Sequence, residues 1–107
     1  MNNWYDELKK LDGRKCFTLT QNKPAIMHID DSGVTIEYPT GGSIKISQAL
    51  LDEAFSKLQI KGVLTLEDVH NGITHGNGAK TDRLMAILRE LPGIGYTGEP
   101  RTLFIKE

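Results

Sequence analysis

The chain has 107 residues, of which 38% are hydrophobic and 25% are charged, and its formal net charge is −1 at pH 7. This length and composition favour a single globular domain over residues 1–107 and exclude a disordered or fibrous protein. The near-neutral balance lacks the basic excess of proteins that attract nucleic acid mainly through charge, and no apolar run approaches the roughly 20 residues that a membrane helix needs.

The chain begins with a predicted helix that carries two aromatic residues. Trp4, Leu8 and Leu11 recur at helical spacing, and Asn3 stands where it can cap the first turn. Trp4 and Tyr5 are adjacent and point to different sides of the helix, so at least one is expected outside the core-facing stripe. Either an exposed aromatic residue anchors a protein partner, or both residues pack over the strands that follow. The first alternative makes Trp4 and Tyr5 partner-binding residues.

Four short strands are predicted next, at residues 17–19, 25–29, 34–38 and 44–46. In the third strand Val34, Ile36 and Tyr38 alternate with polar residues, which is typical of a sheet with one buried face. Turn residues at 30–33 and 40–42 separate the later strands. The simplest arrangement is an antiparallel meander.

Three helices are predicted in the second half. Apolar residues at helical spacing define the first, over 47–60, with Ser47 as its cap. A short extended run at 63–64 leads to Thr65, which can cap a small helix over 66–70 that carries acidic residues in its first turn. Three glycines in 71–78 predict a turn, and a third helix with apolar residues from Leu84 to Leu91 ends at Pro92.

The last predicted element is a hairpin. Its strands contain Ile94, Tyr96, Leu103 and Ile105, and a turn over residues 97–100 separates them. The expected fold class is therefore α+β, with an N-terminal helix and an antiparallel meander followed by three helices and a C-terminal hairpin.

Few residues offer catalytic or metal chemistry. Cys16 is the only cysteine, so the chain has no internal disulfide and no four-thiolate metal site, and a reducing, cytoplasmic location is expected. A small buried thiol is its commonest role. His70 and His75 could share a metal ion with nearby carboxylates, but their spacing fits no known ligand pattern, and solvated side chains are the simpler interpretation. Asp30 begins an acidic pair that is followed by turn residues, so a role in the turn is expected before a role in acid–base catalysis.

The segment 76–81 is glycine-rich and ends in Lys80-Thr81, like part of a phosphate-binding loop. Ala79 separates the last glycine from the lysine, and a polar turn precedes the segment where a buried strand is required. A turn that begins a helix is the better interpretation, although its free N–H groups could hold one backbone phosphate. No enzyme activity and no cofactor are predicted.

The order of elements over residues 47–106 resembles a winged helix-turn-helix. The resemblance implies DNA binding, with the third helix laid against the target and the hairpin as the wing. On helical spacing, Asp82, Ala86 and Arg89 are expected outermost on that helix. The expected nucleic-acid contacts, to phosphates and to one base edge, are Asn77, Lys80, Arg83, Arg89 and Arg101.

Charge weighs against this hypothesis, because acidic residues outnumber basic ones from residue 62 to the end of the chain. A dimer would double the contacts with duplex DNA. The alternative is a protein-interaction module, a subunit or an inhibitor, that uses the same scaffold without binding DNA, since a surface of mixed charge suits the selection of a protein partner.

Overall fold

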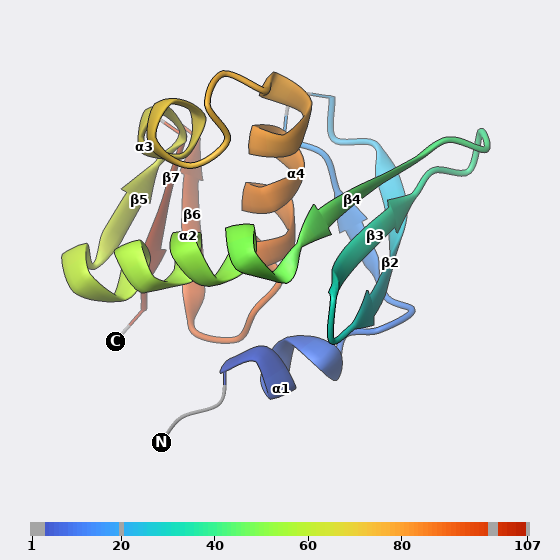
Figure 1. Ribbon diagram of the computed structural model, residues 1–107, viewed down its shortest axis with the longest axis horizontal. Coiled ribbons are helices and arrows are strands. Elements are labelled where there is room, and N and C mark those ends of the chain that lie inside the picture. Colours follow the sequence, from blue (N-terminus) through green and yellow to red (C-terminus); the bar gives the residue numbers. More distant parts are fainter. Residues whose placement is uncertain (1–3, 20, 99–100, 107) are drawn as a thin grey trace.

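The computed structural model describes residues 4–19, 21–98 and 101–106. The first part of the chain contains α1 (Trp4–Lys9), β1 (Lys15–Phe17), β2 (Pro24–Asp30), β3 (Gly33–Glu37) and β4 (Ser43–Ser47). The second part contains α2 (Gln48–Lys61), β5 (Val63–Thr65), α3 (Leu66–Gly72), α4 (Gly78–Arg89), β6 (Ile94–Gly98) and β7 (Arg101–Ile105). The predicted α+β class and the predicted order of elements are confirmed (Figure 1).

The four N-terminal strands form an antiparallel meander in the order β1-β2-β3-β4. Alternation places Met27, Ile36 and Ile46 on the inner face, where all three are fully buried. The turn between β2 and β3 requires glycine. Gly33 has a φ of +148°, and a Cβ there would lie 2.3 Å from the Ile46 carbonyl oxygen. The meander therefore depends on one close backbone approach at Gly33.

Both caps predicted for the second half are present. Ser47 Oγ accepts a hydrogen bond from the Leu50 N–H at 3.3 Å and begins α2. Thr65 and Asp68 form a reciprocal capping box at the start of α3, in which each side chain accepts from the other's backbone N–H. The predicted end of the small helix needs a small correction. It was expected to end at residue 70, but α3 continues to Gly72 and the bend begins only after it.

The second sheet has the order β5-β7-β6, so the predicted hairpin pairs with the short strand that precedes α3. Leu64, Leu103 and Tyr96 lie side by side across it, and the first two are fully buried. Two residues of the predicted turn, 99 and 100, lie outside the described part of the chain. The cap predicted at Asn3 also lies outside it, and α1 ends at Lys9, before Leu11, which the predicted helix included.

Helix α4 lies at the centre of the molecule, between the meander on one side and the three-stranded sheet on the other (Figure 1). Its buried residues point in every direction around the axis. They are Thr81, Asp82, Leu84, Met85, Ala86, Ile87 and Leu88. The buried apolar side chains of the meander and of the second half form one cluster around it. Among the described residues, no helix has the length and apolar character needed to span a membrane.

Candidate functional site

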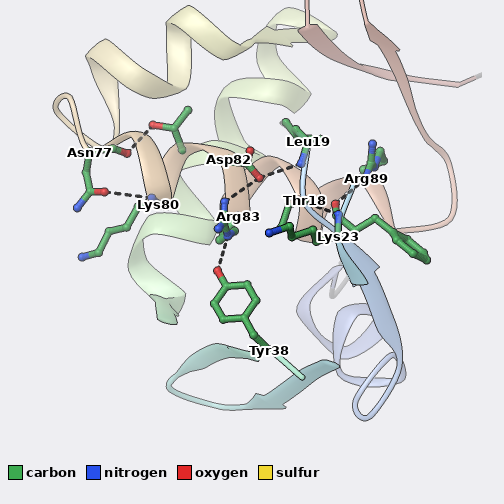
Figure 2. A network of polar contacts seen from close by, with 11 residues as sticks. Thr18, Leu19, Lys23, Tyr38, Asn77, Lys80, Asp82, Arg83 and Arg89 are labelled. Atoms are coloured by element: carbon green, nitrogen blue, oxygen red, sulfur yellow. Dashed lines mark hydrogen bonds and ion pairs between the residues drawn. The ribbon is translucent and has the colours of Figure 1, made fainter. Parts of the chain in front are cut away.

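The start of α4 carries two of the predicted nucleic-acid contacts (Figure 2). Asn77 is the N-cap of the helix, and its Oδ1 accepts the Lys80 N–H at 3.1 Å. Asn77 was the residue expected to reach a base edge, and this bond fixes its side-chain amide at the helix start instead. Lys80 is half-buried, and its ammonium has no ion-pair partner among the described residues.

Arg83 joins α4 to the meander. Its Nε donates to the hydroxyl of Tyr38, just beyond the end of β3, and its guanidinium lies 5.3 Å from the centre of the Tyr38 ring. Its Nη1 is 3.2 Å from Asp82 Oδ1. Burial alone would lower the pKa of Arg83, but the hydrogen bond that Arg83 donates to Tyr38 and the charge of Asp82 outweigh it and raise the pKa. The side chain is therefore a charged internal tie between two elements (Figure 2).

Asp82 corrects the expected orientation of α4. It is only 5% exposed, and Ala86 is fully buried, whereas both were predicted to face outward. The segment after β1 covers this side of the helix, and Asp82 Oδ1 accepts the Leu19 N–H at 2.9 Å. The helical pattern alone suggested one buried stripe, but a second layer of structure buries the opposite side.

Arg89 is also directed into the molecule. Its Nη2 donates to the Phe17 carbonyl on β1 at 2.7 Å, and its guanidinium lies 5.0 Å from the centre of the Tyr96 ring on β6. Arg89 therefore connects the two sheets across the end of α4. Its carbonyl contact uses a donor that a phosphate would need.

Arg101 lies apart from the other basic residues, on β7. It lines a pocket of about 230 Å³ together with His70, Thr81 and Asp82. His70 Nδ1 is 3.1 Å from Thr81 Oγ1, and Thr81 Oγ1 donates to the Asn77 carbonyl at 2.9 Å. An Nδ1–H tautomer of His70 satisfies both contacts, because Thr81 then accepts from the imidazole and donates to the carbonyl. This network ties the end of α3 to the start of α4.

The five predicted nucleic-acid residues thus do not share one exposed surface. Asn77 and Lys80 lie at the accessible start of α4. Arg83 binds the meander, and Arg89 connects the meander with the second sheet. Arg101 lines the pocket beside α3. Of the positive groups in this set, those of Lys80 and Arg101 have no ion-pair partner among the described residues.

The two N-terminal aromatic residues have different surroundings. Tyr5 is buried, and its hydroxyl donates to the Asp30 carbonyl at 2.5 Å, which holds α1 to the end of β2. Burial and the charge of Asp30 raise the pKa of Tyr5. Trp4 is half-buried and stacks on Phe55 of α2, with ring centres 4.4 Å apart and an angle of 10° between the planes. Tyr5 therefore positions α1, while Trp4 keeps an accessible face.

That face of Trp4 borders a second pocket of about 230 Å³, between α1, α2 and the ends of β6 and β7. We call it the Trp4 pocket. Its apolar lining comes from Trp4, Phe55, Leu91, Pro92, Ile94 and Ile105. Glu7, Gln59 and Lys106 form the polar part of its lining. Ile105 is 39% exposed, so an apolar wall of the pocket is open to solvent.

The groups that could carry catalysis are dispersed or buried. Cys16 is 1% exposed, and burial raises the pKa of its thiol to about 11. His70 is engaged by Thr81 within the α3–α4 connection, and His28 pairs with Glu37 on the meander. Across residues 4–19, 21–98 and 101–106 no cluster of three or more metal-ligating side chains occurs.

Several residues of these sites escaped the sequence analysis. Tyr38 and Phe55 were assigned only to a strand and to a helix stripe, and their partners Arg83 and Trp4 lie 45 and 51 residues away in the chain. No local pattern could pair them. Ile60 is different, because it falls outside the apolar stripe of α2 and is 84% exposed. Helical spacing alone could have identified it.

Comparison with known proteins gave no match: no family model fits this sequence, and neither the curated proteins nor the solved structures include one with significant similarity to it.

Proposed function

We propose that this protein is a non-catalytic protein-interaction module, a subunit or an inhibitor that binds its partner through the Trp4 pocket. The observation that carries the proposal is an aromatic and aliphatic lining beside an exposed Ile105. The pocket volume of about 230 Å³ is smaller than that of most small-molecule sites, which begin near 300 Å³. It suits one large apolar side chain of a partner, the kind of anchor that dominates many protein interfaces.

The rigidity of the pocket supports the same proposal. Tyr5 fixes α1 through its bond to Asp30, and Lys9 of α1 pairs with Asp31 at 2.8 Å. Phe55 of α2 stacks on the indole of Trp4 and holds its orientation. A partner side chain therefore meets a preformed wall, and little conformational entropy is lost on binding.

Two variants test this function. Ile105→Arg places a charge in the lining of the Trp4 pocket, whereas Val63→Arg changes another exposed apolar residue, 45% exposed, that lines no described pocket. The wild-type protein and Val63→Arg should capture the same partner from an extract and hold it as salt is raised, and Ile105→Arg should lose it. Capture that Ile105→Arg leaves intact, in a variant that still melts cooperatively, would reject the pocket.

Trp4 provides a direct measurement, because it is the only tryptophan in the chain. Peptides selected for binding should carry one large apolar residue and should shift the emission of Trp4 as the pocket fills. Selected peptides that bind without changing this emission would contradict the assignment. We also propose a reducing, cytoplasmic location, which is compatible with the single buried thiol.

Duplex DNA is a second candidate ligand, favoured by one observation. The order α3, bend, α4, β6, β7 is that of the winged helix-turn-helix it resembles, and Lys80 at the start of α4 has no ion-pair partner among the described residues. In this proposal the protein touches phosphates and does not place α4 in a groove. Retention on DNA should then fall steeply as salt rises, and Lys80→Glu should weaken it for all sequences. If neither raised salt nor Lys80→Glu weakens retention on DNA, phosphate binding at the start of α4 is excluded.

A further inference from the structure

A groove of about 760 Å³ lies between the C-terminal half of α2 and α3, at the end of the molecule where α3 is seen end-on in Figure 1. We call it the α2–α3 groove. It shares no lining residue with the Trp4 pocket. One wall is Lys57, Ile60 and Lys61 from α2, and the other includes Glu67 and Asp68 from α3.

The two walls carry opposite charge. Lys57 and Lys61 stand on the α2 side, with side chains 41% and 56% exposed. Glu67 is exposed on the α3 side and has no ion-pair partner among the described residues. The pairs Lys57–Glu53 and Lys61–Asp68 are both 3.8 Å long. Such long surface pairs contribute little, so the lysines can pair with another molecule at small cost.

Ile60 supplies the apolar part of the same surface. At 84% it is the most exposed of the large hydrophobic side chains in the described part of the chain. It belongs to the last turn of α2 and lies off the buried stripe that ends with Leu58. Because α2 ends at Gly62 in a left-handed conformation, with its N–H bound to the Leu58 carbonyl, the position of Ile60 is fixed by a well-formed helix end.

We propose that the α2–α3 groove is the interface of a homodimer. A two-fold axis brings the same patch of both chains together, so each residue of one wall meets the other wall of the second copy. Here the lysine wall of each copy faces the carboxylate wall of the other, and this match occurs twice. Ile60 of each copy enters the opposite groove near the axis. A partner with a single sign of charge would satisfy one wall and repel the other.

This dimer is independent of the Trp4 pocket and of the function proposed there. The two sites share no lining residue, so substitutions in the groove leave the lining of the pocket unchanged. It would also place two copies of any ligand site on one assembly, which strengthens binding to a repeated or symmetric partner.

Sedimentation equilibrium over a range of protein concentrations tests the proposal. The wild type should reach twice the mass of one chain. Ile60→Asp should weaken self-association by at least about tenfold, while Val63→Asp, an exposed apolar control outside the groove, should leave it unchanged. A wild type that remains monomeric into the millimolar range, or a dimer that Ile60→Asp does not affect, would overturn the proposal.

Charge reversal then tests the pairing of the walls. Lys57→Glu sets a carboxylate of one copy against Glu67 of the other, and Glu67→Lys sets an ammonium of one copy against Lys57 of the other, while Lys61 and Asp68 stay in place. Each variant alone should therefore self-associate at least about tenfold more weakly than the wild type. Asp68 is left unchanged because it caps α3. An equal mixture of the two variants should form a mixed dimer, and Lys57→Glu combined with Glu67→Lys in one chain should restore the homodimer. Failure of both rescues, with the variants still folded, would refute the two-fold arrangement.

Discussion

Tyr38→Phe measures how firmly α4 is tied to the meander. The substitution removes the hydroxyl that accepts from Arg83 Nε and keeps the ring that the guanidinium overlies at 5.3 Å. A hydrogen bond to a charged group contributes about 1.5–3 kcal/mol. The Arg83 side chain is 22% exposed, so water replaces part of the bond, and Asp82 remains 3.2 Å away. We therefore expect the free energy of unfolding to fall by about 1 kcal/mol.

Urea denaturation followed by circular dichroism gives this difference directly, and the melting temperature should fall by about 4–8 °C. Tyr96→Phe is the matched control. The Tyr96 ring lies 5.0 Å from the Arg89 guanidinium, and within the described residues its hydroxyl has no hydrogen-bond partner. Its removal should change stability by less than about 0.5 kcal/mol. If the two substitutions cost the same, Arg83 is not an internal tie and is available to a ligand.

Three further predictions concern the fold. Gly33→Ala should destabilise the protein by more than about 4 kcal/mol, because the added Cβ meets the Ile46 carbonyl, whereas Gly41→Ala, with open space around it, should cost about 1–2 kcal/mol in thermal melts. The backbone hydrogen bond from Thr65 holds the pKa of Asp68 below its ordinary 3.8. The stability this confers is present above that value and is lost as the pH falls through the folded-state pKa, so Asp68→Asn should flatten the stability profile between neutral and strongly acid pH. With a thiol pKa of about 11, Cys16 should resist alkylation at about pH 8 until denaturant unfolds the chain, and rapid labelling of the native protein would contradict its burial.

Local chemistry determined most of what the sequence predicted correctly. Ser47 and Thr65 were recognisable as caps because the N–H groups they accept lie three residues away. The second, third and fourth strands of the meander were recognisable from alternation, and the end of the last helix from Pro92. The first strand was predicted wrongly at 17–19, because β1 covers Lys15–Phe17 and buries Cys16 while Phe17 is 38% exposed. Each of these signals acts within one turn or one strand, so the element order followed from neighbouring residues alone.

The surroundings of α4 could not be predicted in this way. Asp82 is polar and Ala86 small, and on a helix with an apolar stripe both suggest a solvent-facing side. The contact that holds Asp82 in the interior comes from Leu19, whose N–H donates to it across 63 residues of sequence. The wall of the Trp4 pocket depends likewise on a contact between α1 and α2. Long-range pairs of this kind decide which predicted residues remain available for binding.

The free-energy cost of exposing α4 bears on the choice between the two proposed ligands, a protein partner at the Trp4 pocket and duplex DNA at α4. Insertion of α4 into a DNA groove would require the meander to leave, which exposes Met27, Ile36 and Ile46, each fully buried. Exposing three such side chains costs about 5–9 kcal/mol, comparable to the whole stability of a small domain, about 5–15 kcal/mol. The small number of phosphate contacts that Lys80 and its neighbours can make does not offset this free-energy cost at ordinary salt. Any DNA binding must therefore use the outer ends of α4 and β7 with the meander in place, and the preformed Trp4 pocket, which needs no such opening, is the stronger candidate for a binding site.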